Sequence, residues 1–123
     1  MTDETYFFDS YALVEIILGN LNYKPYIKSM VLTTKLNIFE VYHGLLRDAG
    51  EKEAENFLEQ YYPLTIDFNE EDIKKAAQLR IEHKKRNLSM ADCIGFALAK
   101  RFGIKFLTGD KEFKDFDNVE FVK

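Results

Sequence analysis

Short apolar runs alternate with longer segments of helical periodicity along the whole chain. The runs span three to five residues and are bounded by polar or turn-forming positions, which is typical of buried strands. Strands are predicted at residues 5–8, 30–34, 64–66, 104–107 and 119–122.

The segments between these runs place apolar residues at the i, i+3, i+4 spacing of amphipathic helices. Helices are predicted at residues 10–19, 22–28, 51–61, 69–83 and 89–102, and a further one begins after Thr34, which can cap it. Strands that alternate with helices imply right-handed crossovers and a mostly parallel sheet. We therefore predict an α/β fold, a three-layer α/β/α sandwich with a five-stranded sheet, in one domain spanning residues 1–123.

Composition narrows the class of protein without changing this fold. The 123 residues are 46% hydrophobic and 31% charged, which is ordinary for a soluble domain. The single cysteine, Cys93, rules out an internal disulfide and fits a reducing cytoplasm. No apolar stretch approaches the ~20 residues of a membrane span, and the first residues do not resemble a signal peptide. We expect a cytoplasmic protein without membrane association.

Two acids stand just after the carboxyl ends of predicted strands. Asp9 comes after residues 5–8, and Asp110 follows the fourth predicted strand through Thr108 and Gly109. In open α/β sheets, sites form at the carboxyl ends of strands where the strand order reverses. If the first and fourth strands are neighbours there, both acids point into one crevice. Each acid can equally be read as a helix N-cap.

Two further acids lie in predicted helices. Glu40 is off its helix's apolar stripe, and Gly44 one turn later costs about 1 kcal/mol relative to alanine, which suggests that something approaches the helix there. The alternative is a solvated glutamate. Asp92 matches a capping box with Ser89, but it shares a face with Gly95, and such a face lets a helix pack closely on a sheet.

Carboxylates gathered in one crevice repel each other and move toward protonation unless a cation is bound. Hard divalent ions with oxygen ligands remove this conflict. Two such ions about 3.5–4 Å apart can activate a water and stabilise the leaving oxygen of a phosphodiester. The net charge of −4 argues against bulk electrostatic binding of nucleic acid but leaves open an acidic site that recruits cations.

The stretches FFDSYALVE, NIFEVYHGLL, LSMADCIGFALAKRFGIKFLTGDKEF and NVEFVK resemble the PIN domain, and more narrowly the small VapC-type toxins. This resemblance implies a metal-dependent endoribonuclease that uses Mg²⁺ or Mn²⁺ and is commonly a homodimer. It also implies a cognate antitoxin protein that covers or enters the acidic groove. By the same resemblance, the catalytic and metal-binding acids would be Asp9, Glu40, Asp92 and Asp110, with Ser10 and Thr108 as supporting hydroxyl residues.

An RNA substrate also needs positive charge near the acids. A basic run precedes the Asp92 helix and could hold phosphates that flank the scissile one; it comprises Arg80, Lys84, Lys85 and Arg86. The alternative is a solvated helix end, where basic side chains favour the helix dipole. Asp115 and Asp117 lie in a polar turn, so we leave both outside the predicted site.

Other functions also fit parts of this sequence. A receiver-like phosphoacceptor module would use Asp67 after the third predicted strand, but the paired acid beside Asp9 is missing, and no lysine–proline follows the last strand. A haloacid-dehalogenase-like phosphatase would need an acid where Tyr11 stands. A housekeeping PIN nuclease without an antitoxin and a PIN-like binding protein also fit the chain.

Overall fold

The computed structural model describes residues 4–123, so the first three residues of the predicted domain lie outside the described part. The strands are β1 Thr5–Phe8, β2 Met30–Leu32, β3 Lys105–Thr108 and β4 Val119–Phe121. The α-helices are α1 Ser10–Leu18, α2 Lys35–Asp48, α3 Glu51–Tyr61, α4 Glu70–Glu82 and α5 Met90–Phe102. Short 3₁₀ helices are η1 Leu21–Tyr26, η2 Tyr62–Leu64 and η3 Lys111–Phe113. None of the helices in residues 4–123 has the length and apolar run that a membrane span requires.

The four strands form one parallel sheet in the order β2-β1-β3-β4. From β1 the chain adds β2 on one side and later adds β3 and β4 on the other side. The strand order therefore reverses between β1 and β3, as predicted from the sequence. Phe8 pairs with Leu107, so the carboxyl ends of these two strands lie side by side.

The strand predicted at residues 64–66 is wrong, and the sheet has four strands rather than five. Residues 64–66 make only an isolated parallel bridge, in which Thr65 pairs with Thr33 at the end of β2. Pro63 holds the preceding residues in the η2 turn, and Thr34 already caps α2 directly after the bridge. Neither segment therefore has further residues free to extend the ladder.

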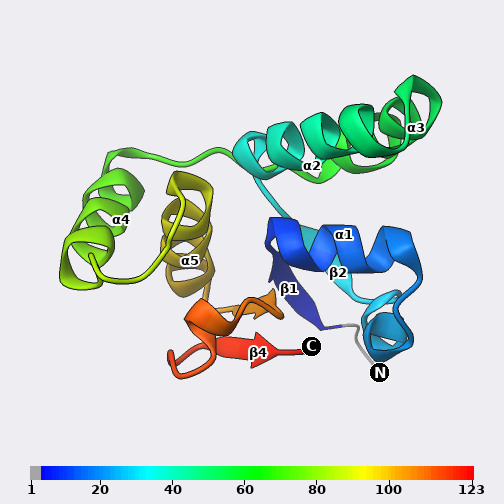
Figure 1. Ribbon diagram of the computed structural model, residues 1–123. Coiled ribbons are helices and arrows are strands. Elements are labelled where there is room, and N and C mark those ends of the chain that lie inside the picture. The colour runs from blue at the N-terminus through cyan, green and yellow to red at the C-terminus, as the bar shows by residue number, and fades with distance from the viewer. Residues whose placement is uncertain (1–3) are drawn as a thin grey trace.

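Alternating side chains of the central strands build two apolar clusters on opposite faces of the sheet. Phe8 and Leu107 pack with Leu13 of α1, whereas Phe7 and Phe106 pack with Ile94 of α5. Figure 1 shows α1 on one side of the strands and α4 and α5 on the other.

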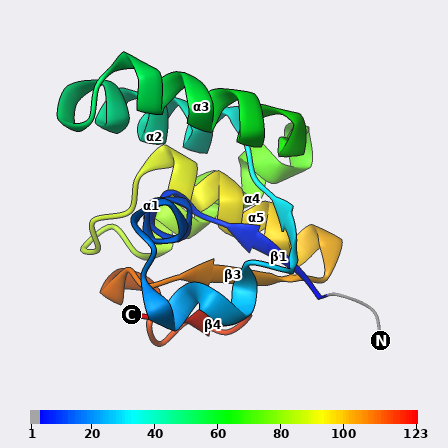
Figure 2. The same cartoon turned by 90° about the vertical axis from the view of Figure 1, so that its right-hand side faces the viewer.

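The helices α2 and α3 form an antiparallel pair that packs mainly on each other and on α1. Figure 2 shows this pair above the sheet, at the end where β1 meets α1. A simple three-layer sandwich therefore describes only part of the molecule. The coarser prediction, an α/β fold with a parallel sheet and covering helices, is confirmed.

The helix α5 lies unusually close to the sheet because of Gly95. A Cβ atom at this position would lie 2.6 Å from Cε1 of Phe7 and 3.2 Å from Cε1 of Phe106. The small residue predicted to permit close packing therefore does so. It brings the start of α5, and with it Asp92, to the edge of the sheet.

Candidate active site

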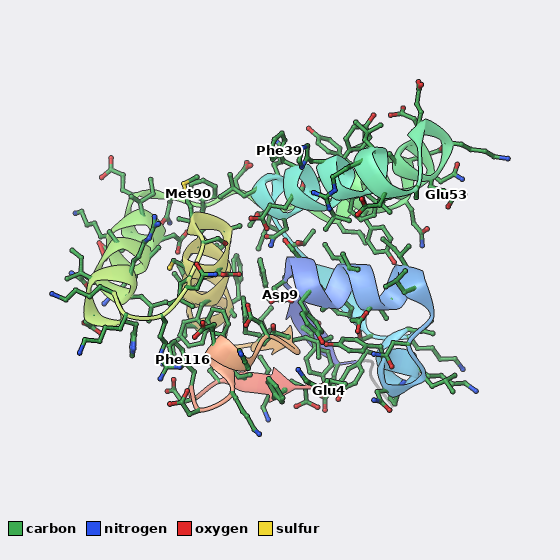
Figure 3. The ribbon with its side chains drawn as sticks, viewed as in Figure 1. Glu4, Asp9, Phe39, Glu53, Met90 and Phe116 are labelled. Atoms are coloured by element: carbon green, nitrogen blue, oxygen red, sulfur yellow. The ribbon has the colours of Figure 1, made fainter. Side chains whose placement is uncertain are left out.

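The carboxyl ends of β1 and β3 place Asp9 and Thr108 together. The amide of Asp9 donates a hydrogen bond to the carbonyl oxygen of Leu107 over 3.3 Å, which continues the β1–β3 ladder by one residue. Asp9 is only 1% exposed, and Thr108 is fully buried. Figure 3 shows Asp9 in the region between α1 and α5.

A groove of about 500 Å³ opens over these strand ends. Its walls come from the start of α1, from α2, from the segment before α5 and from the turn after β3. The lining residues are Asp9, Ser10, Tyr11, Val14, Glu15, Glu40, Asn87, Ser89, Asp92 and Asp110. All four acids predicted from the sequence thus line one groove, although they lie up to about a hundred residues apart in the chain.

Three of these acids also act as helix caps, so the alternative reading of each is correct as well. An oxygen of Asp9 accepts a hydrogen bond from the amide of Ala12 over 2.9 Å. Asp92 accepts one from the amide of Ser89 over 2.9 Å, and Asp110 accepts one from Glu112 over 3.0 Å. Each of these bonds uses one carboxylate oxygen. Capping therefore fixes the direction of the side chain and leaves a second oxygen for other partners.

Glu40 reaches the groove from α2 through contacts that the sequence did not reveal. Its Oε1 accepts a hydrogen bond of 2.5 Å from the hydroxyl of Ser10. The amide nitrogen of Asn37 in turn donates to that hydroxyl over 3.0 Å. Asn37 is fully buried. A polar side chain one turn before Val41, on the buried face of a helix, is the signal that could have identified it.

Burial is the main reason that two of the acids have raised pKa values. It raises the pKa of Asp9 to about 8; the charges of Asp92 and Asp110 act in the same direction, and hydrogen bonds from Thr108 and Ala12 oppose it. Burial likewise raises the pKa of Asp92 to about 6, with contributions from Asp110 and Glu40. The carboxylates are therefore close enough to repel one another, which is the situation that a bound cation relieves.

In a comparison with known protein families, the PIN-domain model matches residues 6–119 of this chain. The chain belongs to the PIN-domain family. Among curated proteins, none matches this sequence significantly.

Solved structures of PIN-domain toxins share the fold. A VapBC2 complex from Rickettsia felis bound to a promoter DNA fragment is 16% identical, with a TM-score of 0.74, over 97% of this chain and 99% of the other. VapC20 of Mycobacterium tuberculosis, a toxin that cleaves the sarcin–ricin loop, is 18% identical, with a TM-score of 0.71, over 94% and 98%. A toxin–antitoxin complex from Klebsiella pneumoniae is 20% identical, with a TM-score of 0.70, over 94% and 95%. At these identities the likeness establishes the fold alone.

The groove of this PIN domain has the donor chemistry that a hard divalent cation prefers. Its polar lining consists of carboxylates, hydroxyls and one amide, without histidine or cysteine. Among residues 4–123, no three acidic, histidine or cysteine side chains already stand close enough to hold a metal ion between them. A divalent ion could therefore be held by three of these side chains only if the carboxylates turned toward one another. The donor set fits Mg²⁺ or Mn²⁺, with waters completing the coordination.

The basic run is only partly available to a substrate. Both terminal nitrogens of the Arg86 guanidinium donate to the carboxylate of Asp115 over 2.8 Å. This pairing lowers the pKa of Asp115 to about 2. The Cζ atom of Arg86 lies 4.7 Å from the centre of the Phe116 ring. Arg86 therefore fastens the loop before α5 to the turn after η3, whereas Arg80, Lys84 and Lys85 are exposed. Their contact with RNA stays a prediction.

Other acids near the chain's end lie outside the groove. Asp117 pairs with Lys100 over 2.8 Å, and Asp115 pairs with Arg86, so each has a structural partner. Asp67, the acceptor required by a receiver-like module, is exposed beside Lys35 and does not line the groove. Together with the PIN-domain assignment, this placement removes the receiver-like alternative.

Gly44 does not have the role suggested by the sequence. A Cβ atom there would meet only a guanidinium nitrogen of Arg47, at 3.8 Å, so no part of the described chain approaches the helix. Gly44→Ala is therefore expected to stabilise the protein by about 0.5–1 kcal/mol, because alanine favours the helix more than glycine. Urea denaturation measures the change. A lower stability would show that the helix is constrained at Gly44 in a way the geometry does not reveal.

Gly109 is a position where glycine is required by close packing. A Cβ atom there would overlap the ring of Tyr11 and the carbonyl oxygen of Val122, and that carbonyl belongs to the backbone. Gly109→Ala is expected to destabilise the protein by about 1–3 kcal/mol and to displace Asp110. Urea denaturation tests the first effect, and Gly44→Ala is the matched control with space for the added methyl group. Unchanged stability would contradict this packing.

Proposed function

We propose that this PIN domain is a metal-dependent endoribonuclease that hydrolyses phosphodiester bonds in RNA. The observation that supports this most directly is that Asp9, Glu40, Asp92 and Asp110 line one groove at the strand-order reversal. Membership of the PIN-domain family supports nuclease chemistry. VapC20, which shares the fold, is a toxin that cleaves the sarcin–ricin loop.

In the proposed reaction, three of the acids would bind the metal ion and the other groove residues would orient them. Asp9, Asp92 and Asp110 bind and orient Mg²⁺ or Mn²⁺, and Glu40 assists from α2. Such an ion, when bound, supplies charge stabilisation at the phosphate and activates a water. Thr108 orients Asp9 through a side-chain hydrogen bond. Its hydroxyl also accepts a hydrogen bond from the amide of Asp110 over 3.0 Å. Ser10 holds Glu40 toward the groove.

The test is cleavage of labelled RNA with Mn²⁺ or Mg²⁺, with and without a chelator, by the wild type and by Asp110→Asn. Asparagine caps helices as well as aspartate does, so η3 should remain intact. We expect cleavage to require the ion and to fall at least about 100-fold in the variant, since metal-ion stabilisation is worth several kcal/mol. Cleavage that persists in chelator, or in Asp110→Asn, would contradict the proposal.

We further propose that the protein is the toxin of a type II toxin–antitoxin pair, acting in the cytoplasm as a homodimer. Solved complexes of the same fold contain toxin and antitoxin together. A housekeeping nuclease is the alternative. Induced expression in cells separates the two, because a toxin arrests growth unless Asp110→Asn disables it, whereas a housekeeping nuclease leaves growth unchanged. The mass in solution tests the dimer.

A further inference from the structure

A chain of four polar side chains runs from Thr34, the N-cap of α2, to the rim of the acidic groove. Thr34 Oγ1 donates to Asn37 Oδ1 over 2.6 Å, and Asn37 Nδ2 donates to Ser10 Oγ over 3.0 Å. Ser10 then donates to Glu40 Oε1 over 2.5 Å. Thr34 and Asn37 are fully buried, whereas Glu40 is exposed. The chain therefore connects a rigid interior anchor to a carboxylate that has solvent around it.

The charge of Glu40 determines the direction of every hydrogen bond in this chain. A carboxylate only accepts hydrogen bonds, so the single hydroxyl proton of Ser10 must point to Glu40. The oxygen of Ser10 must then accept from Asn37, which requires the nitrogen of that amide to face Ser10. The amide oxygen consequently faces Thr34, whose hydroxyl donates to it. Only an asparagine or a similar amide supplies both the donor and the acceptor that this arrangement needs.

We propose that Asn37 is a positioning residue that acts through Ser10 to hold Glu40 over the acidic groove, an inference that rests on the proposed metal-dependent function. Ser10 is the first residue of α1 and directly follows Asp9. A bond from Ser10 to Glu40 therefore fixes an acid of α2 relative to an acid at the end of β1. Without it, Glu40 samples many rotamers, and each productive arrangement of the acids becomes less populated.

The amide protons of Asn37 report on this chain without any metal or RNA. In wild type, one Nδ2 proton is bonded to Ser10, so we expect its NMR signal to be shifted downfield and slow to exchange with solvent. Ser10→Ala removes the acceptor and should abolish the downfield shift, whereas exchange should stay slow because Asn37 is buried. If the Asn37 signals are the same in wild type and Ser10→Ala, the chain does not exist in solution and the inference is wrong.

Mn²⁺ affinity, measured by calorimetry, reports on the positioning itself. Groups that orient metal-binding side chains typically contribute 10- to 100-fold to metal affinity or activity. Asn37→Leu and Ser10→Ala should each weaken Mn²⁺ binding by about 10-fold. The double variant should be no weaker than either single one, because both changes break one chain.

Thr33→Val is the matched control, since its buried hydroxyl donates to the carbonyl oxygen of Phe8 over 3.0 Å and does not touch this chain. It should lower the melting temperature while leaving Mn²⁺ affinity at the wild-type value. If Asn37→Leu behaves in the same way, or if Ser10→Ala leaves affinity unchanged, Asn37 is merely structural and the proposal is overturned. A wild type that binds Mn²⁺ with this variant pattern but cleaves no RNA would refute the proposed function and leave the positioning role standing.

Discussion

Asp9→Asn is expected to lose at least about 100-fold of the RNA cleavage rate and yet to be more stable than the wild type at pH 8 without divalent ions. The loss of activity follows from removing a carboxylate from the centre of the proposed metal site. The gain in stability follows from burial, which raises the pKa of Asp9 from 3.8 to about 8 and is the largest cause of that shift. Asparagine also keeps the hydrogen bond to the amide of Ala12 that begins α1.

The pH dependence of this stability difference has a definite sign. The unfolded chain releases the proton of Asp9 near pH 4, whereas the folded chain holds it until about pH 8. Between these values the folded state binds the extra proton, so stability falls as the pH rises through this window. The variant lacks this group, so it should match the wild type near pH 4 and exceed it by several kcal/mol at pH 8, with about 5 kcal/mol as the upper limit set by the raised pKa.

Urea denaturation in chelator, repeated between pH 4 and pH 9, measures this difference. Asp115→Asn is the control, because Asp115 is an exposed carboxylate whose pKa is lowered by Arg86 rather than raised. It should lose a little stability at neutral pH and gain none at pH 8. An Asp9→Asn protein that unfolds more easily than the wild type at pH 8 would show that the charge on Asp9 stabilises the metal-free fold.

The position of two of the acids could be predicted because it depends on topology. Asp9 and Asp110 follow strands whose order is constrained by right-handed crossovers, and parallel strands all end at the same edge. Asp92 could be placed because Gly95 leaves room for α5 to approach Phe7. In these cases a local pattern and a general rule together determine where the side chain lies.

The remaining features depend on contacts between elements, and no local pattern contains them. Residues 64–66 have a strand-like composition, but β2 ends at Leu32 and leaves only one bridge for them. Arg86 belongs to a basic run, but its guanidinium is held by Asp115, 29 residues further along the chain. The bond from Ser10 to Glu40 spans 30 residues and depends on the orientation of α2, which helical periodicity does not determine.

Divalent ions are expected to strengthen RNA binding by this protein, which is the opposite of their effect on a protein that binds through lysine and arginine. Five carboxylates line the groove, from Asp9, Glu15, Glu40, Asp92 and Asp110, and no lysine or arginine is among its lining residues. A phosphate that enters this groove is repelled unless cations lie between it and the carboxylates. By contrast, binding by basic side chains releases counterions and weakens as salt increases.

Fluorescence anisotropy with a short labelled RNA, in Mg²⁺ or in chelator at equal ionic strength, measures the effect. We expect Mg²⁺ to lower the Kd at least about 10-fold, which corresponds to about 1.4 kcal/mol. The RNA is checked on a gel after each titration, so that cleavage is not mistaken for release. Asp110→Asn should lose most of the gain, since it removes one carboxylate and keeps its cap. Tighter binding in chelator would instead show that Arg80, Lys84 and Lys85 hold the RNA and that the acids act only in the chemical step.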